Sequence, residues 1–387
     1  MQKKLIALAV AGLASTAAFA QTNVTIYGLV DYGYSYRFDS RSLNSIANVP
    51  GASAKPSSQS QLNGGQSLGN RLGFKGTEDL GNGLKAVFLL EQGFMLDTGL
   101  QQTTSGSQFT RQAYMGLSGN FGTAVGGRLY TPHYTFVSGL DPFGAGTVGR
   151  YANVYSSLSA LDVANTGNLM DPVRVDNALA YISPSFGGFT VTGAFSNNAN
   201  LQESPSSNAA NNTVYAILGK YDNGPLSAGV NYHYIAGGST VPVDSVQNVT
   251  VGGSYDFKVA KVMALYSWND LDYTAVGAGN ATLNNYMLGV TAPYGKFTGK
   301  ASYIYSDGNR SAGGDAQQFA LGVDYNLSKR TAFYSAYSFI DNSDNRLNGV
   351  GDASNKGGYT GNGLGNASPA VGGVFQQGVQ VGVRHSF

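Results

Sequence analysis

The sequence of 387 residues has little of several residue types that stabilise most proteins. It contains no cysteine and one tryptophan, and only 12% of its residues are charged, against roughly 25% in typical globular domains. Without cysteine, no disulfide can compensate for a modest core. After residue 20, apolar runs such as Ala86 to Leu90 end at charge or glycine, well short of the ~20 residues of a spanning helix. These features argue against a disulfide-stabilised domain and against a helical membrane protein.

Glycine and tyrosine are abundant instead, with 54 and 25 residues respectively. Glycine weakens a helix by about 1 kcal/mol per site relative to alanine. It is tolerated in strands that twist or pack against neighbouring backbone. Tyrosine combines an apolar ring with a hydroxyl that can face water, which suits a boundary between water and lipid. The composition therefore predicts a β-rich protein that is exported and embedded in a membrane.

The first 20 residues have the pattern of a cleavable secretory signal. Lys3 and Lys4 form a short basic head, an apolar stretch follows, and Ala18 and Ala20 are small residues at the −3 and −1 positions of a cleavage site. A membrane anchor is the alternative, but the apolar stretch is too short to span a bilayer. We expect a signal peptide at residues 1–20 and one barrel domain at residues 21–387. Loss of Lys3 and Lys4 changes the formal net charge from +1 to −1.

Apolar and polar residues alternate along much of the chain. Near the start, Val24, Ile26 and Val30 alternate with Thr25 and Asp31, and the pattern recurs at 226–233, 319–326 and 379–387. A period of two residues is typical of β-strands with one apolar face and one polar face. The pattern fits either a β-sandwich or a membrane β-barrel.

The lengths of the connections favour the barrel. Short and long connections alternate, and the long ones, such as 37–68, 197–211 and 341–375, are rich in Ser, Asn, Gly and Thr. The seven tight turns are 79–83, 119–122, 184–188, 222–225, 258–261, 293–296 and 328–330. They join fourteen strands, and the first and last strands bring the total to about sixteen. A barrel in lipid must close because an open edge would leave backbone groups unpaired, and sixteen strands enclose water.

Several segments resemble the general porin family of Gram-negative bacteria, particularly its β-proteobacterial type. They run in order along the mature chain and are 23–31, 71–86, 111–119, 221–227, 327–331 and 381–387. The resemblance implies an all-β, sixteen-stranded transmembrane barrel that forms homotrimers in the outer membrane. It also implies that the third long loop, at about 130–171, folds into the lumen. The C-terminal Phe387 is similar to the signal that the barrel-assembly machinery recognises.

The resemblance further implies a pore constriction lined by charged residues. Its members would be a basic ladder on the wall and a loop carboxylate: Arg71, Lys75, Arg111, Arg128 and Arg174, then Asp141. Glu91 shares a strand face with Lys85, and we expect it to face the lumen as well. Charges of opposite sign on facing walls set a transverse field that filters ions and aligns dipolar solutes. The alternative is that the arginines only hold the loop by ion pairs or lie at the rim.

The excess of basic residues on the wall predicts a channel that prefers anions. Neutralising Arg71 and Arg111 together should shift the reversal potential in a KCl gradient toward cations, and clear cation selectivity of the wild type would refute the hypothesis. We expect passive passage of ions and small hydrophilic solutes, and contacts with outer-membrane lipid and lipopolysaccharide. Two other functions stay open: a substrate-specific channel, and a surface receptor or adhesin that binds through its polar loops.

Other kinds of chemistry have little support in the sequence. None of the three histidines, His133, His233 and His385, is paired with glutamate at metal-binding spacing, and no nucleophile-elbow sequence occurs. No glycine cluster opens a helix as a phosphate loop does. Basic residues are scattered, which argues against nucleic acid. We predict no catalytic residue, no metal site and no cofactor.

Overall fold

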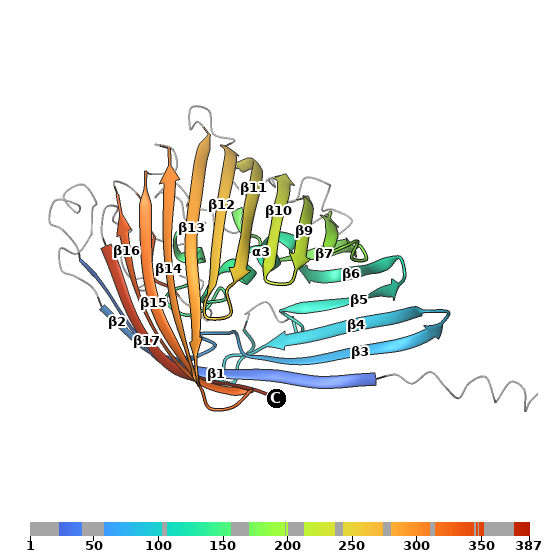
Figure 1. Ribbon diagram of the computed structural model, residues 1–387, viewed down its shortest axis with the longest axis horizontal. Helices are drawn as coiled ribbons and strands as arrows, with labels where there is room; N and C mark the ends of the chain where they lie inside the picture. Colours follow the sequence, from blue (N-terminus) through green and yellow to red (C-terminus); the bar gives the residue numbers. More distant parts are fainter. Residues whose placement is uncertain are drawn as a thin grey trace, which may run out of the picture.

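The strands form a single sheet that closes on itself. The computed structural model describes residues 23–40, 58–102, 107–155, 170–197, 199, 213–236, 243–273, 280–309, 314–343, 346, 348–351 and 375–387. Neighbouring strands pair antiparallel all the way round, and β1 (Asn23–Ser40) pairs with β17 (Phe375–Ser386) (Figure 1). The predicted signal peptide lies outside the described residues. The antiparallel barrel predicted from the sequence is confirmed.

The remaining elements follow in chain order. The first part contains β2 (Ser58–Gly64), β3 (Arg71–Gly81), β4 (Leu84–Gly93), β5 (Gln112–Gly119) and β6 (Gly122–Tyr130), then α3 (Pro132–Leu140) and α4 (Ala152–Tyr155). The middle part contains β7 (Arg174–Ile182), β8 (Phe189–Ser196), β9 (Val214–Asn223), β10 (Leu226–Ala236), β11 (Val243–Asp256) and β12 (Lys261–Tyr273). The last part contains β13 (Ala281–Tyr294), β14 (Phe297–Gly308), β15 (Ala316–Asn326) and β16 (Thr331–Asn342). In the described ranges, no helix is long and apolar enough to cross a membrane.

Two of the seventeen strands share one position in the barrel. β2 pairs with the second half of β1 and β3 with its first half, so the two lie end to end and the barrel is sixteen strands wide. Between them, residues 65–70 leave the sheet. The Asp31 carboxylate accepts hydrogen bonds from the backbone N–H groups of Ser67 (2.8 Å) and Leu68 (2.6 Å), which holds this break against β1. The predicted number of strands is therefore confirmed.

All seven predicted tight turns join strands that pair as hairpins. Most depend on residues that tolerate a left-handed backbone. Asn82 has φ 52° and Gly224 has φ 56°, and both residue types adopt this region at low cost. The short connections at one end of the barrel thus follow from local turn chemistry.

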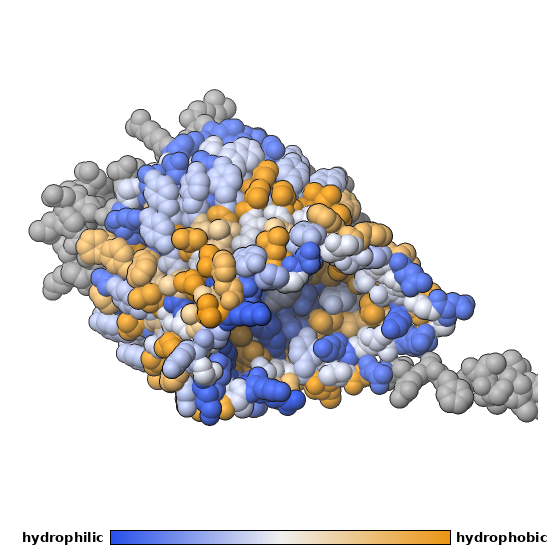
Figure 2. All heavy atoms as spheres, viewed as in Figure 1, coloured by the Kyte–Doolittle hydropathy of each residue, from blue (hydrophilic) through white to orange (hydrophobic). Residues whose placement is uncertain are grey.

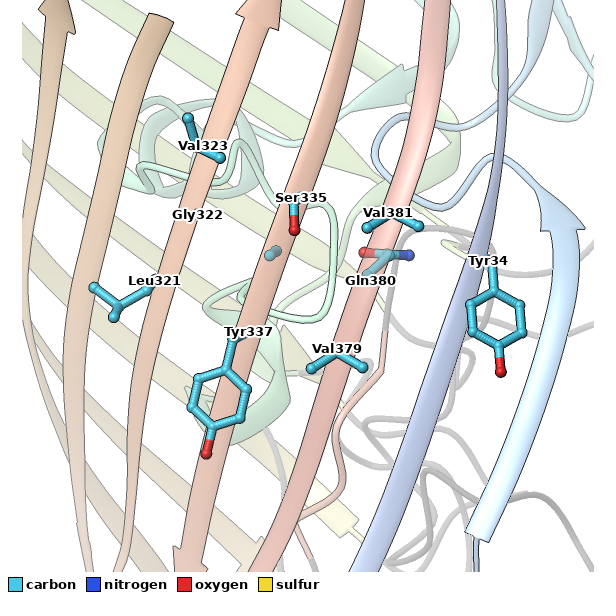
Figure 3. Close-up of a pocket in the computed structure, with 10 residues that line it drawn as sticks. Tyr34, Leu321, Gly322, Val323, Ser335, Tyr337, Val379, Gln380 and Val381 are labelled. Carbon is cyan, nitrogen blue, oxygen red and sulfur yellow. The ribbon is translucent and has the colours of Figure 1, made fainter.

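The two faces of the wall differ as the alternation predicts. Large apolar side chains such as Leu321 and Val381 are exposed on one face, while Gln318 and Gln380 are buried on the other. Figure 3 shows Val379 and Val381 on the near side of β17, with Gln380 behind the strand. Figure 2 shows apolar residues over the outer face and hydrophilic residues in the hollow. A belt of exposed apolar side chains on a closed barrel is the surface that lipid requires.

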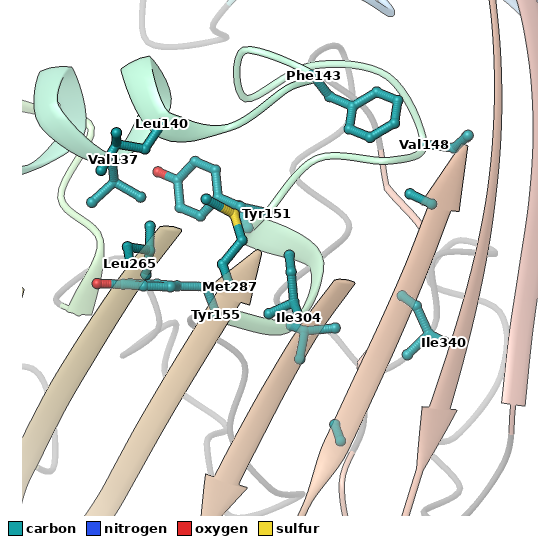
Figure 4. Packing of buried hydrophobic residues seen from close by; sticks show 14 of the residues in the cluster. Val137, Leu140, Phe143, Val148, Tyr151, Tyr155, Leu265, Met287, Ile304 and Ile340 are labelled. Atoms are coloured by element: carbon teal, nitrogen blue, oxygen red, sulfur yellow. The ribbon is translucent and has the colours of Figure 1, made fainter. Parts of the chain in front are cut away.

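The segment 131–155 packs on the polar face of the wall. Thr131 caps α3 by accepting a hydrogen bond at its Oγ1 from the Tyr134 N–H (3.0 Å), and Pro132 follows at the first turn. Helix α3 contacts β8 to β12, and α4 contacts β14 and β15. Figure 4 shows Phe143 of this segment and the wall residue Met287 in the same apolar cluster. The first part of the third loop is thereby fixed to the wall.

Glycines on three wall strands leave the space that this loop segment occupies. A Cβ added at Gly252 would lie 2.6 Å from Leu140, and one at Gly322 would lie 2.7 Å from Phe143. One at Gly289 would lie 2.5 Å from a carbon of Pro142. A side chain at these positions would need the space that Leu140, Phe143 and Pro142 now occupy, so the loop or these side chains would have to shift. The wall and the loop are therefore matched in shape.

Phe387 extends the pairing of the last strand with the first. Phe387 and Gly28 exchange two backbone hydrogen bonds of 3.1 Å, and a Cβ at Gly28 would lie 2.2 Å from a carbon of the Phe387 ring. We expect Gly28→Leu to displace the ring and to lower the yield of folded barrel, measured as the fraction that migrates as folded protein on gels without heating. Gly193→Leu is the control, because nothing lies within 4 Å of its added Cβ. Equal yields for the two variants would contradict the prediction. The role of Phe387 as an assembly signal stays a prediction.

Candidate functional site

Three of the predicted arginines lie together near one carboxylate. Arg71 begins β3, Glu91 is in β4, and Arg111 directly precedes β5. The Arg111 Nε donates to Glu91 Oε1 at 2.6 Å, and Arg71 Nη1 lies 4.0 Å from Glu91 Oε2. Glu91 and Arg111 are 3% and 5% exposed, so this pair is buried, whereas the Arg71 side chain is 22% exposed. Glu91 is thus the anchor of the group.

Tyr130 joins the third arginine, Arg174, to this group. Its hydroxyl accepts hydrogen bonds from Arg111 Nη2 (2.6 Å) and from Arg174 Nη2 (2.7 Å). The Arg174 guanidinium also lies 4.5 Å from the centre of the Tyr130 ring, a cation–π distance. We call Arg71, Glu91, Arg111, Tyr130 and Arg174 the arginine cluster. It carries three positive charges and one negative charge.

Lys75 reaches the cluster through another tyrosine. The Tyr27 hydroxyl donates to Glu91 Oε2 at 2.9 Å, and Lys75 Nζ lies 5.4 Å from the centre of the Tyr27 ring. Neither Tyr27 nor Tyr130 was predicted as a site residue. In the sequence, both belong to a large set of 25 tyrosines, and the family segment 23–31 around Tyr27 assigns it no role in a site. Only the position of Tyr130 at the start of the third loop could have indicated it.

Arg128 lies beside the cluster but is paired separately. Its Nε donates to the Thr110 carbonyl oxygen at 2.9 Å, and its Nη1 forms an ion pair with Asp176 of β7. Both side chains of this pair are about 30% exposed. The charge of Arg128 is balanced by its neighbour, so Arg128 contributes less to a basic surface than Arg71 and Arg174.

Asp141 shapes its own loop. Its carboxylate accepts hydrogen bonds from the backbone N–H groups of Phe143 (3.0 Å), Ala145 (3.0 Å) and Tyr151 (3.1 Å). Asp141 is 5% exposed, and burial raises its pKa to about 6 in spite of these bonds. Across the described ranges, no ion pair joins Asp141 to an arginine of the cluster. The structure therefore does not bring the predicted loop carboxylate together with the basic ladder.

A second ionic group lies on another part of the wall and was not predicted. Asp324 of β15 accepts from Lys300 of β14 (2.8 Å) and from Arg384 of β17 (2.6 Å). Two cations again share one carboxylate. Two further carboxylates also interact electrostatically with these cations, Asp31 with Arg384 and Asp141 with Lys300. This group is therefore closer to charge balance than the arginine cluster.

His133 has a structural setting. It is fully buried in α3, with Nδ1 3.3 Å from Asp171 Oδ1 and Nε2 3.0 Å from the Tyr155 hydroxyl. These contacts join the two ends of the described part of the third loop. Within the part of the chain that the structure describes, no group of three or more His, Cys, Asp or Glu side chains could hold a metal ion.

Comparison with known proteins places the chain among the porins. The Gram-negative porin family matches residues 7–345. Outer membrane porin protein 32 of Delftia acidovorans is 34% identical over 393 residues and covers 100% of both chains. An outer membrane porin protein of Bordetella pertussis is 32% identical, over 88% of this chain and 95% of its own. The solved anion-selective porin from Comamonas acidovorans is 30% identical, with a TM-score of 0.73 over 95% of this chain and 100% of its own.

These matches agree with the closed sixteen-stranded barrel, the apolar outer belt and the charged polar face. They confirm the family that the sequence motifs indicate and the outer membrane as the location. The chain belongs to the family of Gram-negative outer-membrane porins.

Proposed function

We propose that this chain forms a water-filled diffusion channel that prefers anions over cations. The observation that carries the preference is the arginine cluster, which combines three guanidinium groups with a single carboxylate on the polar face of a closed barrel. Guanidinium groups stay charged at all physiological pH values. A net positive wall raises the local concentration of anions and opposes the entry of cations. The name of the Comamonas acidovorans relative, an anion-selective porin, supports the same preference.

The third loop would form the other side of the constriction. Its described part packs on the polar face, which is the inner face of a barrel with an apolar outside. The first turn of α3 lies beside the cluster, since the rings of Tyr134 and Tyr130 stack with centroids 5.1 Å apart. This contact supports a narrow passage between the loop and the arginines. In this proposal, the Asp141 carboxylate does not face the arginines. The loop itself, whose shape Asp141 stabilises, forms the opposite side of the constriction.

The biological unit would be a homotrimer in lipid and lipopolysaccharide, assembled by the barrel-assembly machinery after cleavage of the signal peptide. Membership of the porin family supports this, as does the exposed apolar surface over β15 to β17 and β1. A trimer predicts a band that resists SDS and dissociates on heating, with stepwise triple openings in a bilayer. A single band at monomer size before heating, with single openings, would contradict it.

Liposome swelling tests the diffusion function. Liposomes that contain the purified protein should swell in arabinose, and faster in sodium glutamate than in lysine chloride, because the two amino acids are similar in size and opposite in net charge. No swelling in arabinose would contradict a diffusion pore and favour a surface receptor or adhesin. Saturable block by one solute class would instead indicate a substrate-specific channel.

A further inference from the structure

We infer that Tyr130 is the positioning residue of the anion filter: it holds Arg174 beside Arg111 and links both to the third loop. This inference rests on the proposed anion preference. Tyr130 is the last residue of β6, directly before the Thr131 cap of α3. It is therefore the point where the wall becomes the loop.

The hydroxyl of Tyr130 is shared by two cations. Arg111 Nη2 and Arg174 Nη2 lie 2.6 Å and 2.7 Å from the same oxygen. A phenol oxygen has two lone pairs, and hydrogen bonds from charged donors are shorter and stronger than neutral ones. Two guanidinium groups this close repel each other. A negative dipole between them offsets the repulsion and fixes their separation.

The two arginines depend on Tyr130 to different degrees. Arg111 is also held by Glu91, at 2.6 Å on its Nε. Among the described residues, Arg174 donates its hydrogen bond to the Tyr130 hydroxyl, and the centre of the Tyr130 ring lies 4.5 Å from the Arg174 guanidinium. Loss of the hydroxyl should therefore release Arg174 and leave Arg111 in place. Arg174 is the part of the filter that Tyr130 controls.

The ring of Tyr130 connects the filter to the loop. It stacks on Tyr134 with an interplanar angle of 20° and centroids 5.1 Å apart. Tyr134 lies in the first turn of α3, where its N–H bonds to Thr131 Oγ1 at 3.0 Å. A shift of α3 would thus move Tyr130 and, through it, Arg174. Tyr130 therefore couples the position of the loop, which sets the width of the passage, to the position of the Arg174 charge.

The test compares Tyr130→Phe with Arg174→Gln, alone and together, by zero-current potential in a planar bilayer under a KCl gradient. Tyr130→Phe keeps the ring and removes only the shared oxygen. We expect it to lower the anion-to-cation permeability ratio about twofold or more and to increase the open-channel current noise, because Arg174 becomes mobile. In the Arg174→Gln background, Tyr130→Phe should add little, since both changes act through Arg174. The control is Tyr134→Phe, which should keep the wild-type ratio.

Additive effects of the two changes, or a wild-type ratio in Tyr130→Phe, would overturn the inference. If Tyr130→Phe does not fold, Arg174→Lys decides. Lysine keeps the charge but lacks the planar fork that fits the Tyr130 hydroxyl and ring, so its ratio should also fall. A wild-type ratio in Arg174→Lys would show that charge alone matters and would refute a role of Tyr130. If the wild type prefers cations, the proposed function fails. The role of Tyr130 is still decided by whether the changes in permeability ratio of Tyr130→Phe and Arg174→Gln are additive.

Discussion

Replacing Arg71 and Arg174 together by glutamine is expected to remove most of the anion preference of the channel. Arg71 is partly exposed, lies 4.0 Å from Glu91 and donates to the Gly69 carbonyl oxygen, and Arg174 is held by the neutral Tyr130. Removal of both leaves Arg111 and Glu91 as a neutral pair. We expect the anion-to-cation permeability ratio to fall about fivefold or more, because the net positive charge of the cluster is lost. Zero-current potentials in a KCl gradient measure it.

The matched control is Arg128→Gln, since the charge of Arg128 is already balanced by its ion pair with Asp176. It should change the ratio by much less than the double variant. Equal shifts for Arg128→Gln and for the double variant would mean that the total charge of the wall, rather than the cluster, sets the preference.

Neutralising Arg111 together with Arg71, as proposed from the sequence, is a poor test of ion selectivity. Removal of Arg111 would leave the buried Glu91 without its 2.6 Å partner. Breaking a buried ion pair costs about 3–5 kcal/mol of folding free energy. A loss of stability of this size would confound a measurement of ion selectivity. We expect Arg111→Gln to lower the thermal stability of the barrel and Glu91→Gln in the same chain to restore much of it. Normal stability of Arg111→Gln alone would contradict this account of Glu91.

The second large effect is expected from glycines that seat the third loop. In Gly252→Leu/Gly322→Leu, the new side chains would occupy the space of Leu140 and Phe143 and force the loop away from the wall. Because the segment lies on the polar face of the barrel, displacement moves it into the passage. We expect the single-channel conductance to fall to about half, as a narrower pore holds less water and fewer ions.

Gly193→Leu serves again as the control, because its added Cβ would meet nothing within 4 Å. Wild-type conductance in the double glycine variant, with normal folding on gels, would show that the loop does not narrow the passage. A rise in conductance would mean that the loop detaches from the lumen.

The barrel itself could be predicted from the sequence because its signals are local. Alternation over a few residues assigns each side chain to a face, and turns such as 222–225 carry glycine, asparagine or proline at the bend. The division of one strand into β2 and β3 could not be predicted. Residues 65–70 leave the sheet because Asp31, more than 30 positions earlier, binds Ser67 and Leu68.

The site could be predicted only in part, because its contacts join residues of neighbouring strands that are far apart in the sequence. The positions of Arg71 and Arg111 follow from strand parity and from the family motifs. Their partners do not, since Tyr130 is 44 positions from Arg174 and Glu91 is 20 positions from Arg111. These contacts depend on the register of neighbouring strands, which no local pattern specifies.

The measurement that tests the account most directly is the zero-current potential of the purified wild-type protein in a planar bilayer under a KCl gradient. From the arginine cluster we expect a zero-current potential with the sign of a channel that is more permeable to chloride than to potassium. We expect this potential to be smaller at high salt, where the charges of the wall are screened. A potential of the opposite sign would show that the three guanidinium groups do not control the passage, and it would contradict the proposed function.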